Sequence, residues 1–446
     1  MTTKSISTPY VVFGLGKTGL SCARFLAKMG KDFTVVDTRD QPSELDSLMQ
    51  SLPDVGVLTG ITSNIAIDGC KHLVLSPGIA REHPLVVSAQ RNGVEVIGDI
   101  ELFARHAKAP VLAVTGSNGK STVVTMVTEI LTRANFDVRF GGNLGVPALD
   151  LLADEQPDCF VLELSSFQLE STESLAPSVA CILNVSPDHM DRYDGFSNYL
   201  KAKTRIYKHA DYLVLNADDE ALNKLRPQCE TQYISQSEAA SYRIEENGDV
   251  SWLVAAGERF MRVDDLAAAG THNVMNALAA VAITDRMSVP RSAQRQVLTT
   301  FRGLPHRCQT VAIINGIEWI DDSKGTNVGA TSAAIRGVFS RRRGVLIAGG
   351  QGKGADFDVL AADVAGRVHS VILIGEDANT IAASLDRQAN IHFAINMSAA
   401  VTLGAELARS GEAVLLSPAC ASFDMFESFE ARGQAFVAAV AEIGLA

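Results

Sequence analysis

Short, almost uninterrupted runs of apolar residues recur along the chain, and each ends in a glycine or a polar turn. Strands that are apolar along their whole length are buried on both faces, as in parallel sheets covered by helices. The pattern, strand, turn and then helix, therefore predicts an α/β fold with mostly parallel sheets. The runs are Tyr10–Phe13, Phe33–Val36, Leu73–Leu75, Val111–Val114, Phe160–Leu164, Ala180–Val185, Tyr212–Leu215, Val345–Ala348, Val371–Ile374 and Val414–Leu416.

Two stretches depart from this pattern and help to divide the chain. Ser241–Val263 mixes polar and apolar positions, which predicts antiparallel strands. In Val311–Ile320, an Asn-Gly pair separates two apolar arms, a strong hairpin signal. A chain of 446 residues has room for about three domains. We place the boundaries near Gly98 and before the predicted hairpin, which gives domains 1–98, 99–303 and 304–446.

Composition and charge narrow the classes of function. The net charge of -12 argues against a nucleic-acid partner, which needs clustered lysine and arginine, but it allows local basic sites for small anions. The seven cysteines show no CxxC spacing, so neither a disulfide framework nor a cysteine zinc site is predicted. No signal peptide or membrane span is visible. We expect a soluble cytoplasmic protein without membrane insertion, acting as a monomer.

The first of three glycine-rich turns is Gly14–Gly19, which follows a predicted strand and opens a helix. Glycines at such a turn let the backbone approach a phosphate at the helix N-terminus. Asp37, at the end of the next strand, could accept a hydrogen bond from a ribose or base. Taken alone, the turn fits an NAD-type site, another nucleotide site or a purely structural turn.

The second turn, Thr115–Thr122 with the sequence TGSNGKST, lies between a strand and a helix and predicts a phosphate-binding loop. Lys120 would neutralise the β- and γ-phosphates, and Ser121 could bind magnesium. The standard spacing requires glycine at position 114, where this chain has Val114, so the loop is a shortened variant. The third turn, Gly349–Gly354, is weaker, and a surface turn with a solvated Lys353 is the favoured interpretation.

Several charged side chains stand at unusual positions. Glu163 lies in an apolar strand, where a carboxylate is costly unless it is paired, hydrogen-bonded or bound to a metal such as magnesium. His189 follows a strand among acidic residues and fits a metal ligand, a phosphate contact or a structural role equally. Lys201 and Lys203 fall in an amphipathic helix, whose periodicity alone favours a solvated face for both.

A later helix carries Asn273 and Asn276 on one face, where paired amides could read a purine edge, although Asn273 could simply cap the helix. Polar loops at strand or domain edges are further candidates, because binding and catalytic residues concentrate there. These loops span residues 304–307, 321–327 and 416–424.

Together these segments resemble the Mur ligases over nearly the whole chain. The motifs that carry the resemblance are Thr115–Ser121, Glu163 with Ser165 and Ser166, Asn184–His189, His272–Asn276 and Leu304–Arg307. Gly141–Gly145, Glu163–Glu170, Asp188–Tyr193, Asp322–Thr331 and Leu416–Phe423 most closely resemble the branch of the family that adds D-glutamate. Their joint occurrence, in order and with matching gaps, is far more specific than any single motif.

The resemblance implies a Rossmann-like N-terminal domain that binds a UDP-sugar, a central P-loop-type ATPase domain, and a Rossmann-like C-terminal domain that binds an amino acid. It implies that ATP phosphorylates the alanyl carboxylate of UDP-N-acetylmuramoyl-L-alanine, and that the amine of D-glutamate attacks the acyl phosphate. Alternatives are another Mur-type or folylpolyglutamate-type ligase, an NAD-dependent oxidoreductase and a non-catalytic nucleotide-binding regulator. An Asp-Asn-Pro-Arg run, typical of diaminopimelate-adding members, is absent from the sequence.

The resemblance also assigns residues to ligands. For ATP they are Gly116, Ser117, Asn118, Gly119, Lys120, Ser121, Thr122, Asn273, Asn276, Arg307, Asp322 and Lys324. For the UDP-sugar they are the first-domain residues Thr18, Asp37, Thr38, Arg39, Gly78 and Asn143, together with Ser165. For D-glutamate they are Thr326, Lys353, Ser422, Phe423 and Phe429.

For two magnesium ions the resemblance implies Ser121, Glu163, His189 and Lys203. Lys203 matches the lysine that the family carries as a carbamate formed with carbon dioxide. The catalytic group is then Lys120, Glu163, His189 and Lys203.

Three positions depart from the family pattern: Lys17 replaces a common apolar residue, Phe423 a leucine and Gly325 an alanine. The last change is expected to loosen its turn. Because the implied ligands are anionic, basic residues are expected to line clefts while the surplus acids lie elsewhere. These basic residues are Lys17, Arg39, Lys120, Arg307, Lys324 and Lys353.

Overall fold

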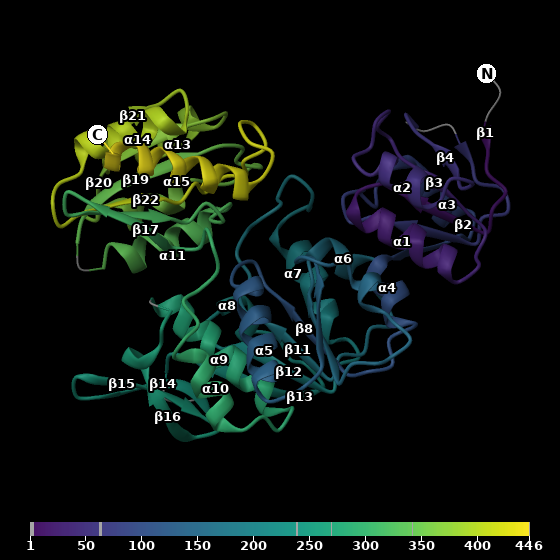
Figure 1. The fold of residues 1–446 in the computed structure, drawn as a ribbon, viewed down its shortest axis with the longest axis horizontal. Helices are drawn as coiled ribbons and strands as arrows, with labels where there is room; N and C mark the ends of the chain where they lie inside the picture. The colour runs from purple at the N-terminus through teal and green to yellow at the C-terminus, as the bar shows by residue number, and fades with distance from the viewer. Residues whose placement is uncertain (1–3, 62–64, 238–239, 269, 341, 446) are drawn as a thin grey trace.

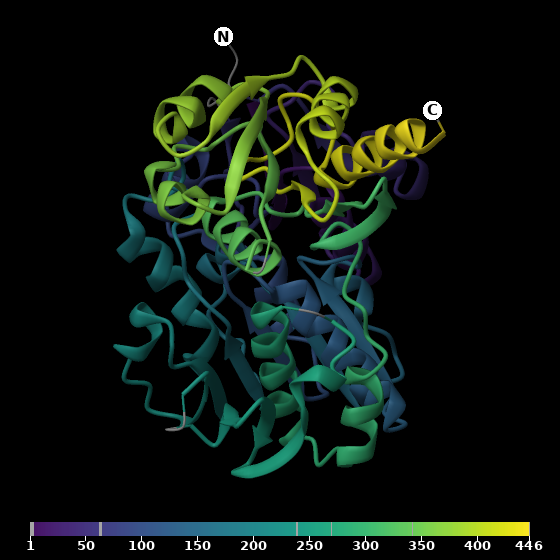
Figure 2. The same ribbon diagram turned by 90° about the vertical axis from the view of Figure 1, so that its left-hand side faces the viewer.

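The computed structural model describes residues 4–61, 65–237, 240–268, 270–340 and 342–445. Over these residues the predicted α/β fold is confirmed, with three large sheets that form three lobes (Figure 1). The N-terminal lobe (purple) and the C-terminal lobe (green to yellow) both lie against the central lobe. In the view of Figure 2, the C-terminal lobe sits directly above the central lobe.

The N-terminal lobe holds a parallel sheet in the order β4-β3-β2-β6-β7. Strand β2 lies between β3 and β6, and the turn after β2 is therefore at the point of the sheet edge where ligands bind in such folds. A short pair, β1 with β5, flanks the sheet. The elements are β1 (Lys4–Ser5), β2 (Tyr10–Phe13), α1 (Lys17–Lys28), β3 (Phe33–Val36), α2 (Leu45–Ser51), β4 (Gly56–Leu58), β5 (Ile65–Ala66), β6 (His72–Leu75), α3 (Pro84–Arg91) and β7 (Glu95–Gly98).

The central lobe holds the sheet β16-β15-β14-β13-β12-β11-β8-β10-β9, which is parallel from β9 to β14. The antiparallel strands predicted over residues 241–263 are confirmed as β14, β15 and β16. Its strands are β8 (Val111–Thr115), β9 (Val138–Gly142), β10 (Cys159–Glu163), β11 (Val179–Ile182), β12 (Tyr212–Asn216), β13 (Glu230–Ser235), β14 (Tyr242–Asn247), β15 (Val250–Ala255) and β16 (Glu258–Arg262). Its helices are α4 (Asp99–Ala104), α5 (Lys120–Arg133), α6 (Ser166–Glu170), α7 (Phe196–Thr204), α8 (Glu220–Asn223), α9 (Thr271–Asp285) and α10 (Arg291–Leu298).

The centre of this sheet is buried on both faces, as its apolar pattern requires. Leu112 and Val114 of β8 pack into a core with α5 and α9. Val111 and Ala113, on the other face, belong to a core that continues into the N-terminal lobe through residues such as Leu15. The shared core fixes the N-terminal lobe against the central lobe by burying apolar surface.

The C-terminal lobe holds the sheet β17-β18-β22-β19-β20-β21, parallel except for the pair β17 and β18. That pair is the hairpin predicted from its Asn-Gly turn, which is confirmed. The elements are β17 (Gln309–Ile314), β18 (Ile317–Asp321), α11 (Val328–Val338), β19 (Gly344–Gly349), α12 (Ala361–Val364), β20 (Val368–Ile374), α13 (Ala378–Leu385), β21 (Asn390–Phe393), α14 (Met397–Leu407), β22 (Ala413–Leu416) and α15 (Phe429–Leu445).

One predicted strand ends early. The apolar run suggested a strand to Val185, but β11 ends at Ile182. Beyond it, the Asn184 side chain accepts a hydrogen bond from the Asn118 backbone N–H at 2.8 Å and donates one to the Asn118 carbonyl at 3.0 Å. These two side-chain hydrogen bonds take the place of strand pairing and hold this segment beside the predicted phosphate loop.

A buried carboxyl marks the start of the central lobe. Asp99, at the start of α4, is 2% exposed. Its Oδ2 accepts a hydrogen bond from Gln168 at 2.9 Å, whereas Oδ1 has no partner among the described residues. Burial raises the pKa of Asp99 to about 6. The folded protein therefore holds this proton at a pH where the unfolded chain has released it.

We expect Asp99→Asn to stabilise the protein at pH 8 by about 1–3 kcal/mol, because the buried carboxylate is removed while an acceptor for Gln168 remains. The folded pKa lies above the unfolded one, so the free energy of unfolding falls as the pH rises from about 4 to about 6. The variant's advantage in urea unfolding should therefore be larger at pH 8 than at pH 5. An advantage that is equal at both pH values would contradict this assignment.

No helix in the described ranges combines the length and the apolar character that a bilayer span requires. All seven cysteines are free, in agreement with the absence of a predicted disulfide framework.

Candidate active site

The predicted phosphate loop connects β8 to α5 at the centre of the central sheet. Gly116 and Gly119 have φ angles of 155° and 83°, which favour glycine and let the loop turn back on itself. A Cβ at Gly119 would lie 2.5 Å from the Asn276 side-chain oxygen, so a larger residue would displace that amide as well as adopt a strained φ. Val114, the departure from the standard spacing, is simply a buried residue of β8.

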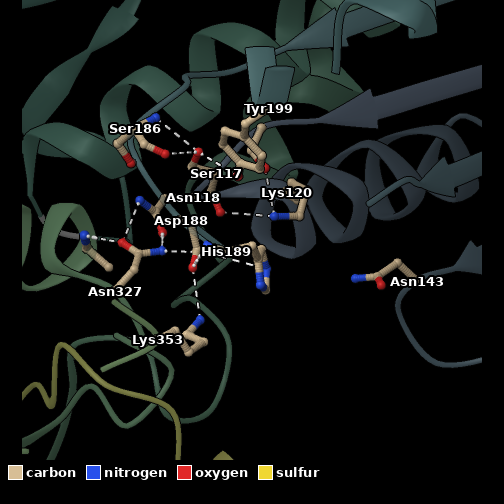
Figure 3. A network of polar contacts seen from close by, with 12 residues as sticks. Ser117, Asn118, Lys120, Asn143, Ser186, Asp188, His189, Tyr199, Asn327 and Lys353 are labelled. Carbon is tan, nitrogen blue, oxygen red and sulfur yellow. Dashed lines mark hydrogen bonds and ion pairs between the residues drawn. The ribbon is translucent and has the colours of Figure 1, made fainter. Parts of the chain in front are cut away.

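Lys120 begins α5 and folds back over this loop. Its Nζ donates to the carbonyls of Gly116 at 2.8 Å and Ser117 at 2.9 Å, and Figure 3 shows the ammonium group against the loop. Burial lowers the pKa of Lys120, while the charges of Glu163 and Asp188 oppose that shift. The loop therefore carries a cation where phosphate groups would lie.

Glu163 ends β10 beside the loop and is 3% exposed. Its Oε1 accepts a hydrogen bond from Asn143 at 2.7 Å, but Oε2 has no partner in the described part of the chain. Burial opposes ionisation, yet the charge of Lys120 and the Asn143 hydrogen bond hold the pKa of Glu163 below its usual value. The result is an ionised carboxylate with one unsatisfied oxygen, which is what a divalent cation requires.

Lys203 lies inside the protein and not on a solvated face, so that interpretation is wrong. The side chain is 2% exposed, its Nζ donates to the Gly116 carbonyl at 2.9 Å, and the Tyr199 ring lies 4.6 Å away. Lys201, two residues earlier, is exposed as predicted. Burial and the nearby Lys120 charge hold the pKa of Lys203 well below its usual value, which favours the neutral amine.

His189 stands in the loop after β11 with a φ of 59°, a conformation that few non-glycine residues adopt. Its Nε2 lies 3.7 Å from a carboxylate oxygen of Asp188, and its ring makes an edge-to-face contact with the Phe167 ring, with the ring centres 4.8 Å apart. Burial lowers the pKa of His189 to about 4. The imidazole is therefore neutral at physiological pH and retains a nitrogen lone pair for a ligand.

Two cavities meet at the phosphate loop. The first, of about 660 Å³, includes residues predicted to bind ATP: Asn118, Gly119, Thr122, Asn273, Asn276, Arg307, Asp322 and Lys324. The second, of about 590 Å³, includes Ser117, Lys120, Ser121, Asn143, Glu163, Ser165, His189, Lys203, Thr326, Lys353, Ser422, Phe423 and Phe429. Asn118, Gly119, Arg307 and Lys324 line both.

The C-terminal lobe contributes charged groups to the boundary between these cavities. Arg307 donates to the Ser121 hydroxyl at 2.8 Å. Asp322 accepts a hydrogen bond from Ser417 at 2.6 Å, and burial raises its pKa to about 7. Lys324 lies 3.8 Å from the centre of the Phe429 ring, and burial lowers its pKa to about 8. The loop of one lobe and the cations of another thus face the same space.

Lys353 is the second lysine whose environment differs from expectation. Its side chain is 17% exposed, and its Nζ lies 2.8 Å from a carboxylate oxygen of Asp188 in the central lobe. The prediction of a solvated lysine is therefore wrong.

The first-lobe candidates Thr18, Asp37, Thr38, Arg39 and Gly78 lie outside both cavities. Asp37 accepts hydrogen bonds from the Leu15 N–H at 2.6 Å and from Arg39, so its oxygens already hold the glycine turn. A direct contact of Asp37 with a ribose or a UDP-sugar stays a prediction. Asn143, grouped with the first domain, belongs instead to the loop after β9 of the central sheet.

Of the basic residues expected in clefts, Lys120, Arg307, Lys324 and Lys353 line the cavities. Lys17 and Arg39 are exposed on the N-terminal lobe and line neither of these two cavities, so their place in a cleft stays a prediction. A Cβ at Gly325 would lie 2.7 Å from both Asp322 Oδ2 and Ser417 Oγ, so glycine fits closely here; that it loosens the turn stays a prediction.

Sequence reasoning left other residues of the site without a role. Tyr199 shares a 3.0 Å hydrogen bond with Ser117 and sits one helical turn before Lys203. Asn327 joins two lobes, although its sequence context indicates only a polar loop. The helical spacing of Tyr199 and Lys203 was a usable signal for a shared buried face. For Asn327, the sequence indicated a candidate polar loop but no contact between lobes.

Models of known families match the three lobes separately. Residues 8–98 match the Mur ligase MurD-like N-terminal domain, residues 114–284 the Mur ligase middle domain, and residues 306–420 the Mur ligase glutamate ligase domain. Among solved structures, a UDP-N-acetylmuramate-alanine ligase of Thermotoga maritima superposes with a TM-score of 0.62 at 20% identity, covering 98% of this chain and 100% of that one. This likeness concerns the fold.

Curated relatives match along almost the full length. A UDP-N-acetylmuramoylalanine--D-glutamate ligase of Nitrosococcus oceani is 46% identical, covering 98% of this chain and 97% of its own. The protein of the same name from Pseudomonas aeruginosa is 45% identical, covering 97% of this chain and 98% of its own. Sequence likeness of this extent, together with the domain matches, shows that the chain belongs to the Mur ligase family.

Proposed function

We propose that the chain joins D-glutamate to the alanyl carboxylate of UDP-N-acetylmuramoyl-L-alanine while ATP is cleaved to ADP and phosphate, a step in peptidoglycan precursor synthesis. The observation that carries the proposal is the meeting of two cavities at one phosphate loop. One cavity can hold a nucleotide while the other brings two further substrates to its terminal phosphate. The names of the full-length relatives supply the substrates.

ATP occupies the first cavity in this proposal. Asn273 and Asn276, on α9, face the adenine, since amide groups both donate and accept hydrogen bonds. Asp322 faces the ribose, while the loop amides and Lys120 hold the phosphates. Arg307, which already contacts Ser121, lies where charge on the transferred phosphoryl group can be stabilised.

The second cavity holds the reacting carboxylate and the amino acid. Lys353 and Ser422 take the carboxylates of D-glutamate, beside Thr326, Phe423 and Phe429. A carboxylate oxygen of the alanyl group attacks the γ-phosphorus, and ADP leaves. The amine of D-glutamate then attacks the carbonyl carbon of the acyl phosphate and expels inorganic phosphate. Placing all groups in adjoining cavities converts these encounters into steps within one complex.

Magnesium fits the site, since the free Oε2 of Glu163 and the neutral His189 are suitable ligands. We propose that Ser121 and Glu163 hold one ion, and that His189 and a carbamate on Lys203 hold a second. Bound magnesium would offset the repulsion between the substrate carboxylate and the γ-phosphate. Among the described residues, no cluster of three His, Cys, Asp or Glu side chains stands ready for a metal, so a carbamate on Lys203 would add a needed anionic oxygen.

The Lys203 carbamate rests on a buried amine whose pKa lies well below its usual value, because only an unprotonated amine reacts with carbon dioxide and the lowered pKa favours that form. We expect Lys203→Ala to reduce turnover by about a hundredfold. Acetate or formate should restore part of it by occupying the space with a carboxylate. The exposed Lys201→Ala serves as the control and should keep normal turnover. An active Lys203→Ala without added acid would contradict the carbamate.

A panel of amino acids tests the proposed function. Phosphate release is followed with ATP, magnesium and UDP-N-acetylmuramoyl-L-alanine while the amino acid is varied. D-Glutamate should support the fastest turnover, with little from L-lysine or diaminopimelate. Equal or faster turnover with either of those two would contradict the assigned specificity.

A further inference from the structure

Four side chains form a polar bridge between the central and C-terminal lobes, which we call the inter-lobe latch. Asn118 comes from the phosphate loop and Asp188 from the loop after β11, both in the central lobe. Asn327 precedes α11 and Lys353 follows β19, both in the C-terminal lobe. Figure 3 shows them side by side, linked by hydrogen bonds and an ion pair.

Asn327 stands at the centre of the latch and is 5% exposed. Its Oδ1 caps α11 by accepting from the Ala330 N–H at 2.9 Å. Its Nδ2 donates to Asn118 Oδ1 at 3.2 Å and to Asp188 Oδ2 at 3.1 Å. The same amide therefore fixes the start of a C-terminal helix and touches two loops of the central lobe.

Asp188 extends the latch to the amino-acid side of the cavity. While Oδ2 accepts from Asn327, Oδ1 accepts from Lys353 Nζ at 2.8 Å. Asp188 and Lys353 side chains are only 10% and 17% exposed, so salt screens this pair weakly. Asn118 is itself held in place, because the Asn184 side-chain amide hydrogen-bonds to both the backbone N–H and the carbonyl of Asn118. The latch thus connects well-supported points on each lobe.

We propose that Asn327 is a positioning residue that sets the C-terminal lobe against the phosphate loop, so that the amino-acid acceptor reaches the activated carboxylate. This proposal rests on the proposed function, in which Thr326 and Lys353 bind the acceptor on one lobe and Lys120 holds the phosphates on the other. The reacting atoms are brought together only when the two lobes have the correct orientation relative to each other. Without the latch, a smaller fraction of molecules has the lobes correctly oriented. The apparent affinity for the acceptor is reduced in proportion to that fraction.

The test replaces Asn327 with serine, which retains a helix cap but loses both Nδ2 hydrogen bonds. We expect a larger radius of gyration for the free protein in small-angle X-ray scattering. The KM for D-glutamate should rise at least tenfold, while kcat stays within about threefold because bound substrates hold the lobes together. An unchanged scattering profile with KM within twofold would overturn the proposal, as would a fall in kcat with KM unchanged.

Asn396→Ala is the matched control. Asn396 caps α14 in the same lobe by accepting a hydrogen bond from the Ala399 N–H at 2.9 Å, and it is not part of the latch. The substitution should lower the melting temperature and leave KM unchanged. An equal rise in KM would mean that Asn327 acts only through stability, which would overturn the proposal.

A second variant keeps the test decisive if serine is poorly tolerated. Asn327→Asp preserves the shape of the side chain and the helix cap but places a carboxylate against Asp188. Its scattering profile and KM should therefore change more than those of the serine variant. A smaller change would overturn the proposal. The scattering comparison needs no turnover. If the unsubstituted protein used no D-glutamate, the proposed function would fail, and scattering alone would still decide whether the latch holds the lobes.

Discussion

Turnover should fall by about a thousandfold when Glu163 is replaced with alanine, although the protein stays folded. The reason is the free Oε2, an ionised oxygen inside the site that no described residue satisfies. A group kept in this costly state makes sense if a cation binds there. The measurement is ligation rate at saturating substrates, with circular dichroism to check the fold.

Glu163→Gln separates charge from shape in the same experiment. Glutamine can still accept the Asn143 hydrogen bond, so the melting temperature should stay close to that of the unsubstituted protein. Turnover should nevertheless remain low, because the anionic oxygen is gone. A glutamine variant with near-normal turnover would show that Glu163 is structural and would contradict the assigned magnesium site.

Lys120→Ala should also reduce turnover by about a thousandfold. Its ammonium group is the cation that the phosphate loop holds, through the carbonyls of Gly116 and Ser117. Removing it leaves the transferred phosphoryl group without that positive charge. The comparison is made at saturating ATP, so that weaker nucleotide binding does not account for the loss.

Two further variants test the role of the Lys120 charge. Lys120→Met keeps the length of the side chain and should be as inactive as alanine, because charge is what the phosphates require. Lys108→Ala changes an exposed lysine shortly before β8 and should leave turnover unchanged. Turnover within tenfold of normal in the methionine variant would contradict the role given to Lys120.

The fold was predictable because its signals are local. Apolar runs such as Val111–Val114 are buried on both faces, and the Asn-Gly pair in Val311–Ile320 turns a hairpin, as their sequences indicate. The phosphate loop was equally visible, since glycines at fixed spacing between a strand and a helix are typical of backbone that wraps an anion. Each of these features depends on neighbours a few residues away.

The environments of the lysines could not be predicted in this way. Lys203 is buried against Gly116, 87 positions earlier, and Lys353 pairs with Asp188, 165 positions earlier. A lysine in a helix or a glycine turn is expected to be solvated until these distant partners are placed. The hydrogen bonds that Asp37 accepts from Leu15 and Arg39 were likewise not visible in the sequence pattern, and its contact with a UDP-sugar stays a prediction.

The negative net charge and the anionic ligands are compatible because cations concentrate at the cavities. Lys120, Arg307, Lys324 and Lys353 line them. Burial lowers the pKa of Lys324 to about 8, so its charge depends on what binds nearby. A phosphate or carboxylate at this boundary would favour the charged form of that lysine.

Activation of the alanyl carboxylate as an acyl phosphate is the central step of the proposed reaction, and oxygen labelling tests this step directly. UDP-N-acetylmuramoyl-L-alanine is labelled with oxygen-18 in both oxygens of the alanyl carboxylate and incubated with ATP, magnesium, D-glutamate and the protein. Because the carboxylate oxygen that attacks phosphorus leaves with it, each inorganic phosphate should carry one labelled oxygen, and the other should remain in the amide product. Phosphate free of label, alongside normal amide formation, would contradict the mechanism.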